Sequence, residues 1–206
     1  NNTDLVDLYF NKNIYNVEIV LGTGYVFTGE AQHHGLSTAM YRVITVKSDS
    51  YITTYGTHDT WDTGNVISFS SLFKNRNENN KNYYHDLNSW DTGNVTNMNN
   101  MFENSSYIQF NISDWDTGNV IYMNSSFRNA AYFNPDLSNW NTSNVTTMQT
   151  IFMQAEGFNS DIDGWDVGNV INFHYAFYAA RSFKYNLNSW NVSGRQINMN
   201  HMFAYA

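Results

Sequence analysis

The sequence contains no cysteine, which excludes disulfide bonds, thiolate catalysis and cysteine-ligated zinc from this 206-residue chain. Proline occurs once and only 14% of the residues are charged, so polarity comes from amides and hydroxyls, with 33 asparagines among them. The net charge of -8 leaves no basic patch for phosphates, which argues against nucleic-acid and anionic-membrane partners. No apolar run approaches the ~18 residues of a membrane span. With 42% hydrophobic and 17% aromatic residues, the chain is nevertheless expected to fold around a core.

The tryptophans reveal an internal repeat. They stand at positions 61, 90, 115, 140, 165 and 190, and the last five are 25 residues apart. The longer first interval contains a polar insertion within residues 74–82, of the kind that a surface loop tolerates. A fixed period in this range is typical of a solenoid, in which each unit packs only on its neighbours.

Each column of the repeat predicts a local structure. The unit is L-x-x-W-[DN]-[TV]-[GS]-N-V-x-x-[MF]-x-x-x-F. Trp and the Thr or Val two residues later are expected on one face of a short strand, because side chains there alternate. Positions five, eight and twelve after Trp are spaced by three and four, which predicts a short helix or 3₁₀ segment. The Asn four residues after Trp is expected to form a stacked amide column that satisfies backbone groups.

The tryptophans could instead form an exposed ladder that stacks on sugars. Burying one is worth up to ~5 kcal/mol, whereas six exposed indoles would create an apolar patch larger than monomers usually tolerate. We therefore expect them in the core. The Thr column two residues after Trp raises ice binding as a further alternative, but strand parity places that column inside as well.

The strand positions directly before and after each Trp are expected to face away from the core. They form a flat, small and acidic sheet face that is exposed for binding. Stacked Asp residues would repel by less than ~1 kcal/mol per pair in water, and bridging Ca²⁺ would reverse this repulsion. No dedicated calcium loop is present, so a solvated face is favoured and no cofactor is assigned. The candidate binding residues are Ser89, Asp91, Asp114, Asp116, Asn139, Asn141 and Asp166.

No catalytic or metal site is predicted. The six histidines are scattered, and no nucleophile motif, phosphate loop, H-E-x-x-H motif or paired-carboxylate pocket occurs. The first 60 residues differ from the rest, because 15–30 and 40–49 alternate apolar with polar residues and predict β-strands. We therefore expect a small all-β module over 1–60, followed by a six-repeat solenoid over 61–206.

The segments SWDTGNVTNMNNMF (89–102) and DLSNWNTSNVTTMQTIF (136–152) resemble the repeats of BspA-like leucine-rich-repeat surface proteins, of the mycoplasma-lipoprotein type. The resemblance covers 61–206 and implies a leucine-rich-repeat-like solenoid, an exported or cell-surface location and a role in adhesion. It implies no catalytic residue. Residues 1–60 weakly resemble a PKD-like β-sandwich, with a truncated sandwich or a plain β cap as the two alternatives.

Two functions follow as expectations. The first is a non-enzymatic binding or adhesion module, extracellular or on a cell or virion surface, that presents the acidic sheet face to a protein or glycan. The second is a structural subunit of a filament, surface layer or virion appendage, in which copies of the chain cover one another. Because the last repeat is irregular and stops at Ala206, we expect the natural protein to continue.

Overall fold

The computed structural model describes residues 17–21, 25–30, 41–45, 63–64, 66–75 and 84–206. These residues contain six strands and no helix. The strands are β1 (Val17–Leu21), β2 (Tyr25–Glu30), β3 (Tyr41–Thr45), β4 (Val66–Ser68), β5 (Tyr84–Asp86) and β6 (Gln109–Asn111).

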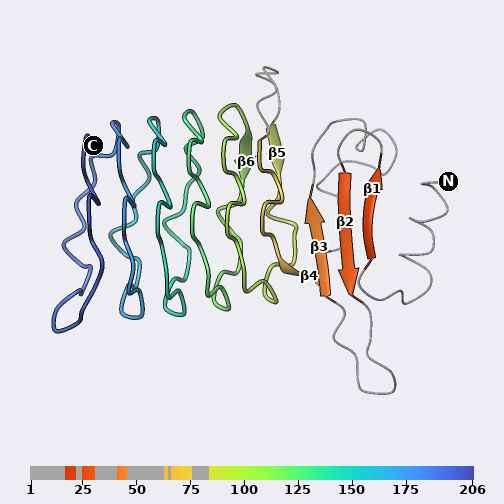
Figure 1. Cartoon of the computed structure of the whole chain (residues 1–206), viewed down its shortest axis with the longest axis horizontal. Helices are drawn as coiled ribbons and strands as arrows, with labels where there is room; N and C mark the ends of the chain where they lie inside the picture. Colours follow the sequence, from red (N-terminus) through yellow and green to blue (C-terminus); the bar gives the residue numbers. More distant parts are fainter. Residues whose placement is uncertain (1–16, 22–24, 31–40, 46–62, 65, 76–83) are drawn as a thin grey trace.

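The first four strands form one sheet in the order β1-β2-β3-β4. The pairs β1–β2 and β2–β3 are antiparallel, as the alternating apolar and polar residues of this region predict. β4 is parallel to β3, with Arg42 opposite Val66. The sheet therefore continues from the N-terminal strands into the first coil, and β1–β3 lie at one end of the coil stack (Figure 1). The division into two modules at residue 60 stays a prediction.

The rest of the described chain winds into coils that lie side by side (Figure 1). Neighbouring coils are joined by isolated parallel bridges, one residue per coil, and by the parallel pair β5–β6. The bridged residues stand seven after Trp in each regular repeat, so the strand-like position is not at Trp itself. They are Ser68, Asn97, Tyr122, Thr147, Asn172 and, one residue later in the irregular last repeat, Asn198.

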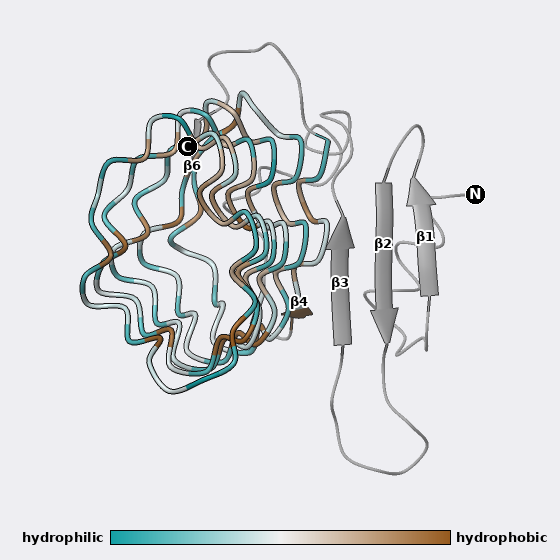
Figure 2. Ribbon diagram, turned by 60° about the vertical axis from the view of Figure 1, so that its left-hand side comes forward, coloured by the Kyte–Doolittle hydropathy of each residue, from teal (hydrophilic) through white to brown (hydrophobic). Residues whose placement is uncertain are grey.

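The interior is built from the predicted apolar columns, which line up from coil to coil (Figure 2). The five described tryptophans, from Trp90 to Trp190, are between 2% and 9% exposed, which confirms their place in the core; Trp61 lies outside the described residues. Their rings are nearly parallel in successive coils, with centroids 5.8 Å apart for Trp90–Trp115 and 6.2 Å for Trp115–Trp140. The Thr column is also buried at Thr92, Thr117 and Thr142, as parity predicted.

Four of these tryptophans are also hydrogen-bonded between coils. The indole N–H of Trp140 donates to the carbonyl of Ile112 in the preceding coil at 3.0 Å, and Trp115, Trp165 and Trp190 repeat the contact. A buried indole needs such an acceptor. This bond explains why the column is Trp rather than Phe.

The segment after the bridge consists of successive turns in place of the expected short helix or 3₁₀ segment. In one coil Ser126 N–H donates to the Met123 carbonyl, whereas Ser125 and Phe127 donate to Gln149 and Ile151 of the next coil. Alternate N–H groups thus bond within the coil and between coils, which an α-helix does not allow. The backbone makes this possible through two left-handed, non-glycine residues per coil, such as Ser125 (φ 57°) and Asn129 (φ 54°).

Candidate functional site

The expected acidic face is present as a column of turns rather than as a strand face. The residue directly after Trp accepts a bond from the backbone N–H two residues later, at 3.2 Å for Asp91, 2.9 Å for Asp116 and 2.8 Å for Asp166. Asn141 does the same at 3.1 Å. These Asx turns fix the side chains and leave them exposed, because a short carboxylate or amide satisfies the turn locally. We call Asp91, Asp116, Asn141 and Asp166 the acid column.

Neighbouring members of the acid column come close to one another. A Cβ placed on Gly93 would lie 3.4 Å from Asp116 Oδ2 and 3.6 Å from Asp91 Oδ1, so two carboxylates flank this glycine. Each Asp of the column is followed two residues later by Gly, whereas Asn141 is followed by Ser143, whose hydroxyl donates to the amide oxygen at 2.8 Å. The acid column therefore carries a charged Asp where the residue two positions later is Gly, and a neutral Asn where that residue is Ser143.

The positions before Trp are exposed as well. Ser89, Asp114 and Asn139 all lie on the surface. Asp114 accepts a bond from the Ser113 hydroxyl at 3.3 Å, and its backbone N–H donates to Asn88 of the preceding coil at 3.0 Å. All seven sequence-predicted binding residues are thus accessible, and the four of the acid column follow one another coil by coil.

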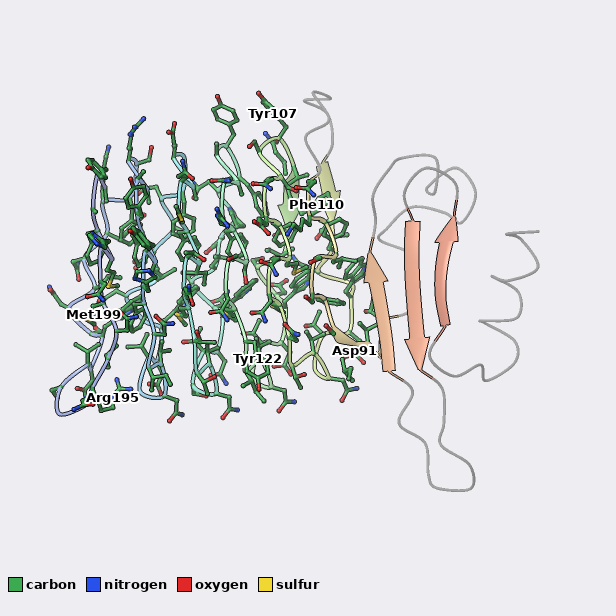
Figure 3. All side chains as sticks on the ribbon, viewed as in Figure 1. Asp91, Tyr107, Phe110, Tyr122, Arg195 and Met199 are labelled. Carbon is green, nitrogen blue, oxygen red and sulfur yellow. The ribbon has the colours of Figure 1, made fainter. Side chains whose placement is uncertain are left out.

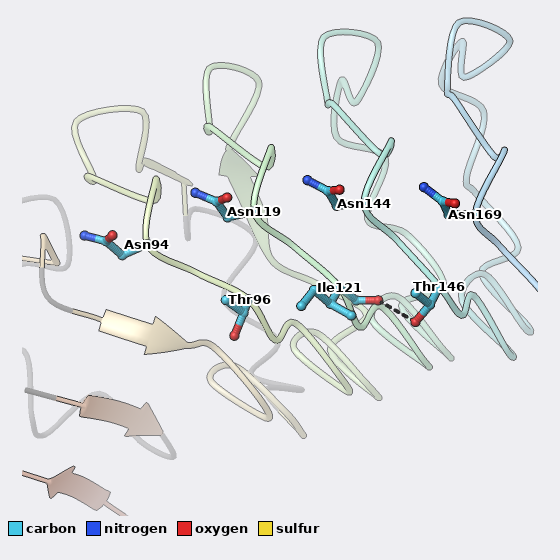
Figure 4. Close-up of a pocket in the computed structure, with 7 residues that line it drawn as sticks. All are labelled: Asn94, Thr96, Asn119, Ile121, Asn144, Thr146 and Asn169. Carbon is cyan, nitrogen blue, oxygen red and sulfur yellow. Dashed lines mark hydrogen bonds between the residues drawn. The ribbon is translucent and has the colours of Figure 1, made fainter. Parts of the chain in front are cut away.

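A second surface feature is a shallow groove of about 560 Å³ that crosses several coils (Figure 4). One side is the predicted amide column, in which Asn119 Nδ2 donates to the Gly93 carbonyl at 2.6 Å and Asn144 Nδ2 to the Gly118 carbonyl at 2.7 Å. This confirms the role of that column in satisfying backbone carbonyls. The full lining is Asn94, Thr96, Asn119, Ile121, Asn144, Thr146 and Asn169.

The most buried carboxylate of the described coils belongs to an ion-pair column. Glu103 is 7% exposed, with Oε2 2.5 Å from Lys74 Nζ and Oε1 3.4 Å from Arg128 Nη1. The three residues occupy the same repeat position in successive coils, so the carboxylate ties coils together. Within the described ranges no three His, Asp or Glu side chains gather in a way that could hold a metal ion.

In the part of the chain that the structure describes, no helix is long and apolar enough to cross a membrane.

The family model described as "Mycoplasma protein of unknown function, DUF285" matches residues 38–137 and 104–206. These ranges cover most of the chain, which therefore belongs to this family. No curated protein and no solved structure matches it.

Sequence reasoning missed two surface features. The groove depends on the column six residues after Trp, at Thr96, Ile121 and Thr146, which alternates between hydroxyl and apolar side chains. The second is the exposed Tyr132, which stands seventeen after Trp, where Tyr107 also stands. Aligning the repeats over all 25 columns would have shown both.

Proposed function

We propose that the chain is a leucine-rich-repeat-like solenoid of the BspA-like surface type, with a PKD-like β module at its start. In this proposal it acts outside the cell as a non-enzymatic binding or adhesion module. Its acid column presents carboxylates to a cationic patch of a protein, or to a glycan. No cofactor is part of the proposal.

The observation that carries the proposal is the Asx-turn geometry of the acid column. Each side chain is short, exposed and already fixed by a backbone N–H, as in Asp116 with Gly118 at 2.9 Å. Such groups lose little conformational entropy when they meet a partner. Their spacing is set by the coil repeat, so the surface is suited to an extended partner rather than to a small substrate in a closed pocket.

The test replaces Asp91, Asp116 and Asp166 together by Asn. This change removes three charges and keeps the Asx turns, because Asn141 and Asn191 form the same turn naturally at 3.1 and 3.2 Å. Beads coated with the full chain are tested for attachment to cultured epithelial cells and to immobilised matrix proteins. We expect the parent beads to attach, the triple variant to attach several-fold less, and added salt to weaken attachment of the parent.

The matched control removes three charges elsewhere. Asp86→Asn and Asp161→Asn change carboxylates in a second set of Asx turns, with N–H to Oδ1 distances of 3.2 and 3.1 Å, and Glu156→Gln supplies the third. This control is expected to attach as the parent does. Equal attachment of parent and acid-column variant, or equal losses in both variants, contradicts recognition by the acid column.

A second function is favoured by the last coil. In earlier coils the outward N–H groups donate to the next coil, as Tyr175 does to Asn200 and Phe177 to Met202. The equivalent N–H groups of His201 and Phe203 donate to no backbone carbonyl within the described residues, so they can pair with a further coil, whether that coil belongs to the same chain or to another copy.

We therefore propose, as the alternative, a structural subunit in which copies of the chain stack end to end. Light scattering during size exclusion separates the two functions. A monomer at all concentrations favours the binding module, and polymers that grow with concentration favour the structural role.

A further inference from the structure

A hollow of about 350 Å³ lies between the second and third described coils, away from the acid column. One side of it is β6 and the other is the segment 132–136 of the next coil. β6 pairs with β5, but residues 134–136, one coil later, form no strand and do not continue the ladder.

One wall of the hollow is Tyr132, which is 66% exposed. Tyr107 of the preceding coil stacks against it, with centroids 5.2 Å apart and a tilt of 33°, and reaches outward at the edge of the stack (Figure 3). The next coil has Gly157 at the same repeat position, where a Cβ would lie 2.7 Å from the Ala131 carbonyl oxygen. The aromatic column therefore stops at Tyr132, because Gly157 has no side chain.

The rest of the lining includes Asn134 and Asp136, whose hydrogen-bonding groups are only partly used within the protein. Asp136 accepts both bonds from Ser138, at 3.0 Å from the N–H and 2.7 Å from the hydroxyl, on the same oxygen Oδ1. Its Oδ2 thus keeps its capacity to accept. Asn134 uses its Oδ1 for the N–H of Asn159 at 2.8 Å, which leaves its amide protons available as donors.

This combination matches one ligand chemistry. A pyranose ring has an apolar face of C–H bonds, which packs on the electron-rich face of an exposed tyrosine. Its neighbouring hydroxyls need one strong acceptor and one donor side by side, and Asp136 and Asn134 line the hollow together. No basic side chain lines it, which disfavours an anionic sugar.

We propose that this hollow is a binding site for a neutral oligosaccharide, with Tyr132 as the stacking platform and Asp136 and Asn134 as hydroxyl partners. The site goes beyond the acid column of the proposed function. The two can fail independently, because they share no residue.

The experiment is calorimetric titration of the full chain with neutral linear hexasaccharides: cellohexaose, maltohexaose and chitohexaose. We expect saturable binding of at least one of them. Tyr132→Ala should weaken it about tenfold, and Tyr132→Phe should retain it, because the ring is kept. Asp136→Asn should weaken it less, since an amide oxygen is the poorer acceptor.

Tyr122→Ala is the control, because Tyr122 is also exposed, at 44%, and lies on the opposite side of the stack from Tyr107 in Figure 3. It should bind as the parent does. Circular dichroism establishes that each variant is folded. Absence of saturable binding at millimolar concentration of all three sugars overturns the proposal, and so does a folded Tyr132→Ala variant with the parent's affinity. The cationic chitosan hexamer is titrated as a charge control, and binding confined to this hexamer and abolished by salt also overturns the proposal, because charge alone would then explain it.

Discussion

Phe127→Ala tests whether the coils are held together by ring stacking through the interior. Phe127 is 2% exposed and lies between Phe102 and Phe152, with ring centroids 5.4 and 5.3 Å away. It also contacts Phe133 and Trp140 at 6.0 and 5.9 Å. Truncating a fully buried ring costs about 3–5 kcal/mol of unfolding free energy, which includes ~0.5–1.5 kcal/mol for each stacked pair.

The same column supplies the control. Phe203 is 50% exposed and stacks on one side only, on Phe177 at 5.2 Å. Its burial and its stacking are both about half of those at Phe127, so Phe203→Ala should cost about 1–2 kcal/mol. Phe127→Leu keeps apolar volume but loses the two stacks, and should fall between the two at ~2 kcal/mol.

Urea unfolding followed by tryptophan fluorescence measures all three variants, because the described indoles are buried in the same core. The midpoint and the slope of each urea unfolding curve are compared together. This is needed because the stability of a repeat array is the sum of contributions from single repeats and from contacts between neighbouring repeats. A loss below ~1 kcal/mol for Phe127→Ala, or one equal to that of Phe203→Ala, would refute the continuous stacked core.

Three further predictions use single positions. Trp140→Phe leaves a carbonyl of the preceding coil without its indole donor and should cost about 2–4 kcal/mol in the same urea assay; a cost under ~1 kcal/mol contradicts the bond. Thr150→Asn should raise the unfolding free energy by ~0.5–1 kcal/mol in the same urea assay, because Thr150 has a φ of 54° and Asn100 already occupies this turn in another coil; a fall in the unfolding free energy contradicts this. The Ser138 N–H and then its hydroxyl hold the pKa of Asp136 below its ordinary value of 3.8. This stabilisation is complete above that value and is lost as pH falls through the lowered pKa, so Asp136→Asn should lose less stability than the parent between about pH 4 and pH 2.

The core was predictable from the sequence because the buried positions recur with the same period as the sequence repeat. Val120, Met123 and Phe127 are spaced by three and four, and all three are buried. Successive turns, in which an N–H donates to the carbonyl three residues earlier, produce the same spacing. The spacing of apolar residues therefore could not distinguish a helix from the turns that form. The left-handed conformations at residues such as Tyr175 and Ala179 leave no sequence signal.

The acid column was predictable as an exposed column but not as a set of turns. Alternation around Trp115 placed Asp116 outside and Thr117 inside, and burial agrees. A strand was inferred from that alternation, yet the Asp116 side chain bonds the Gly118 N–H and makes a turn there, while the parallel bridge forms at Tyr122. An Asx turn produces the same in-out pattern over three residues, and the D-T-G sequence fits it equally well.

In the proposed function recognition resides in the exposed columns, and the bonds between coils are made mainly by other side chains. Coil-to-coil bonds from the Thr117 hydroxyl to the Asn141 carbonyl and from the Asn119 amide to the Gly93 carbonyl use side chains of the fixed columns. Positions outside them contribute less to the stacking of coils, so Asp can alternate with Asn in the acid column without disturbing the register. Substitution of exposed columns should therefore change what the chain binds while leaving its unfolding free energy nearly unchanged, and substitution of a fixed column should do the reverse.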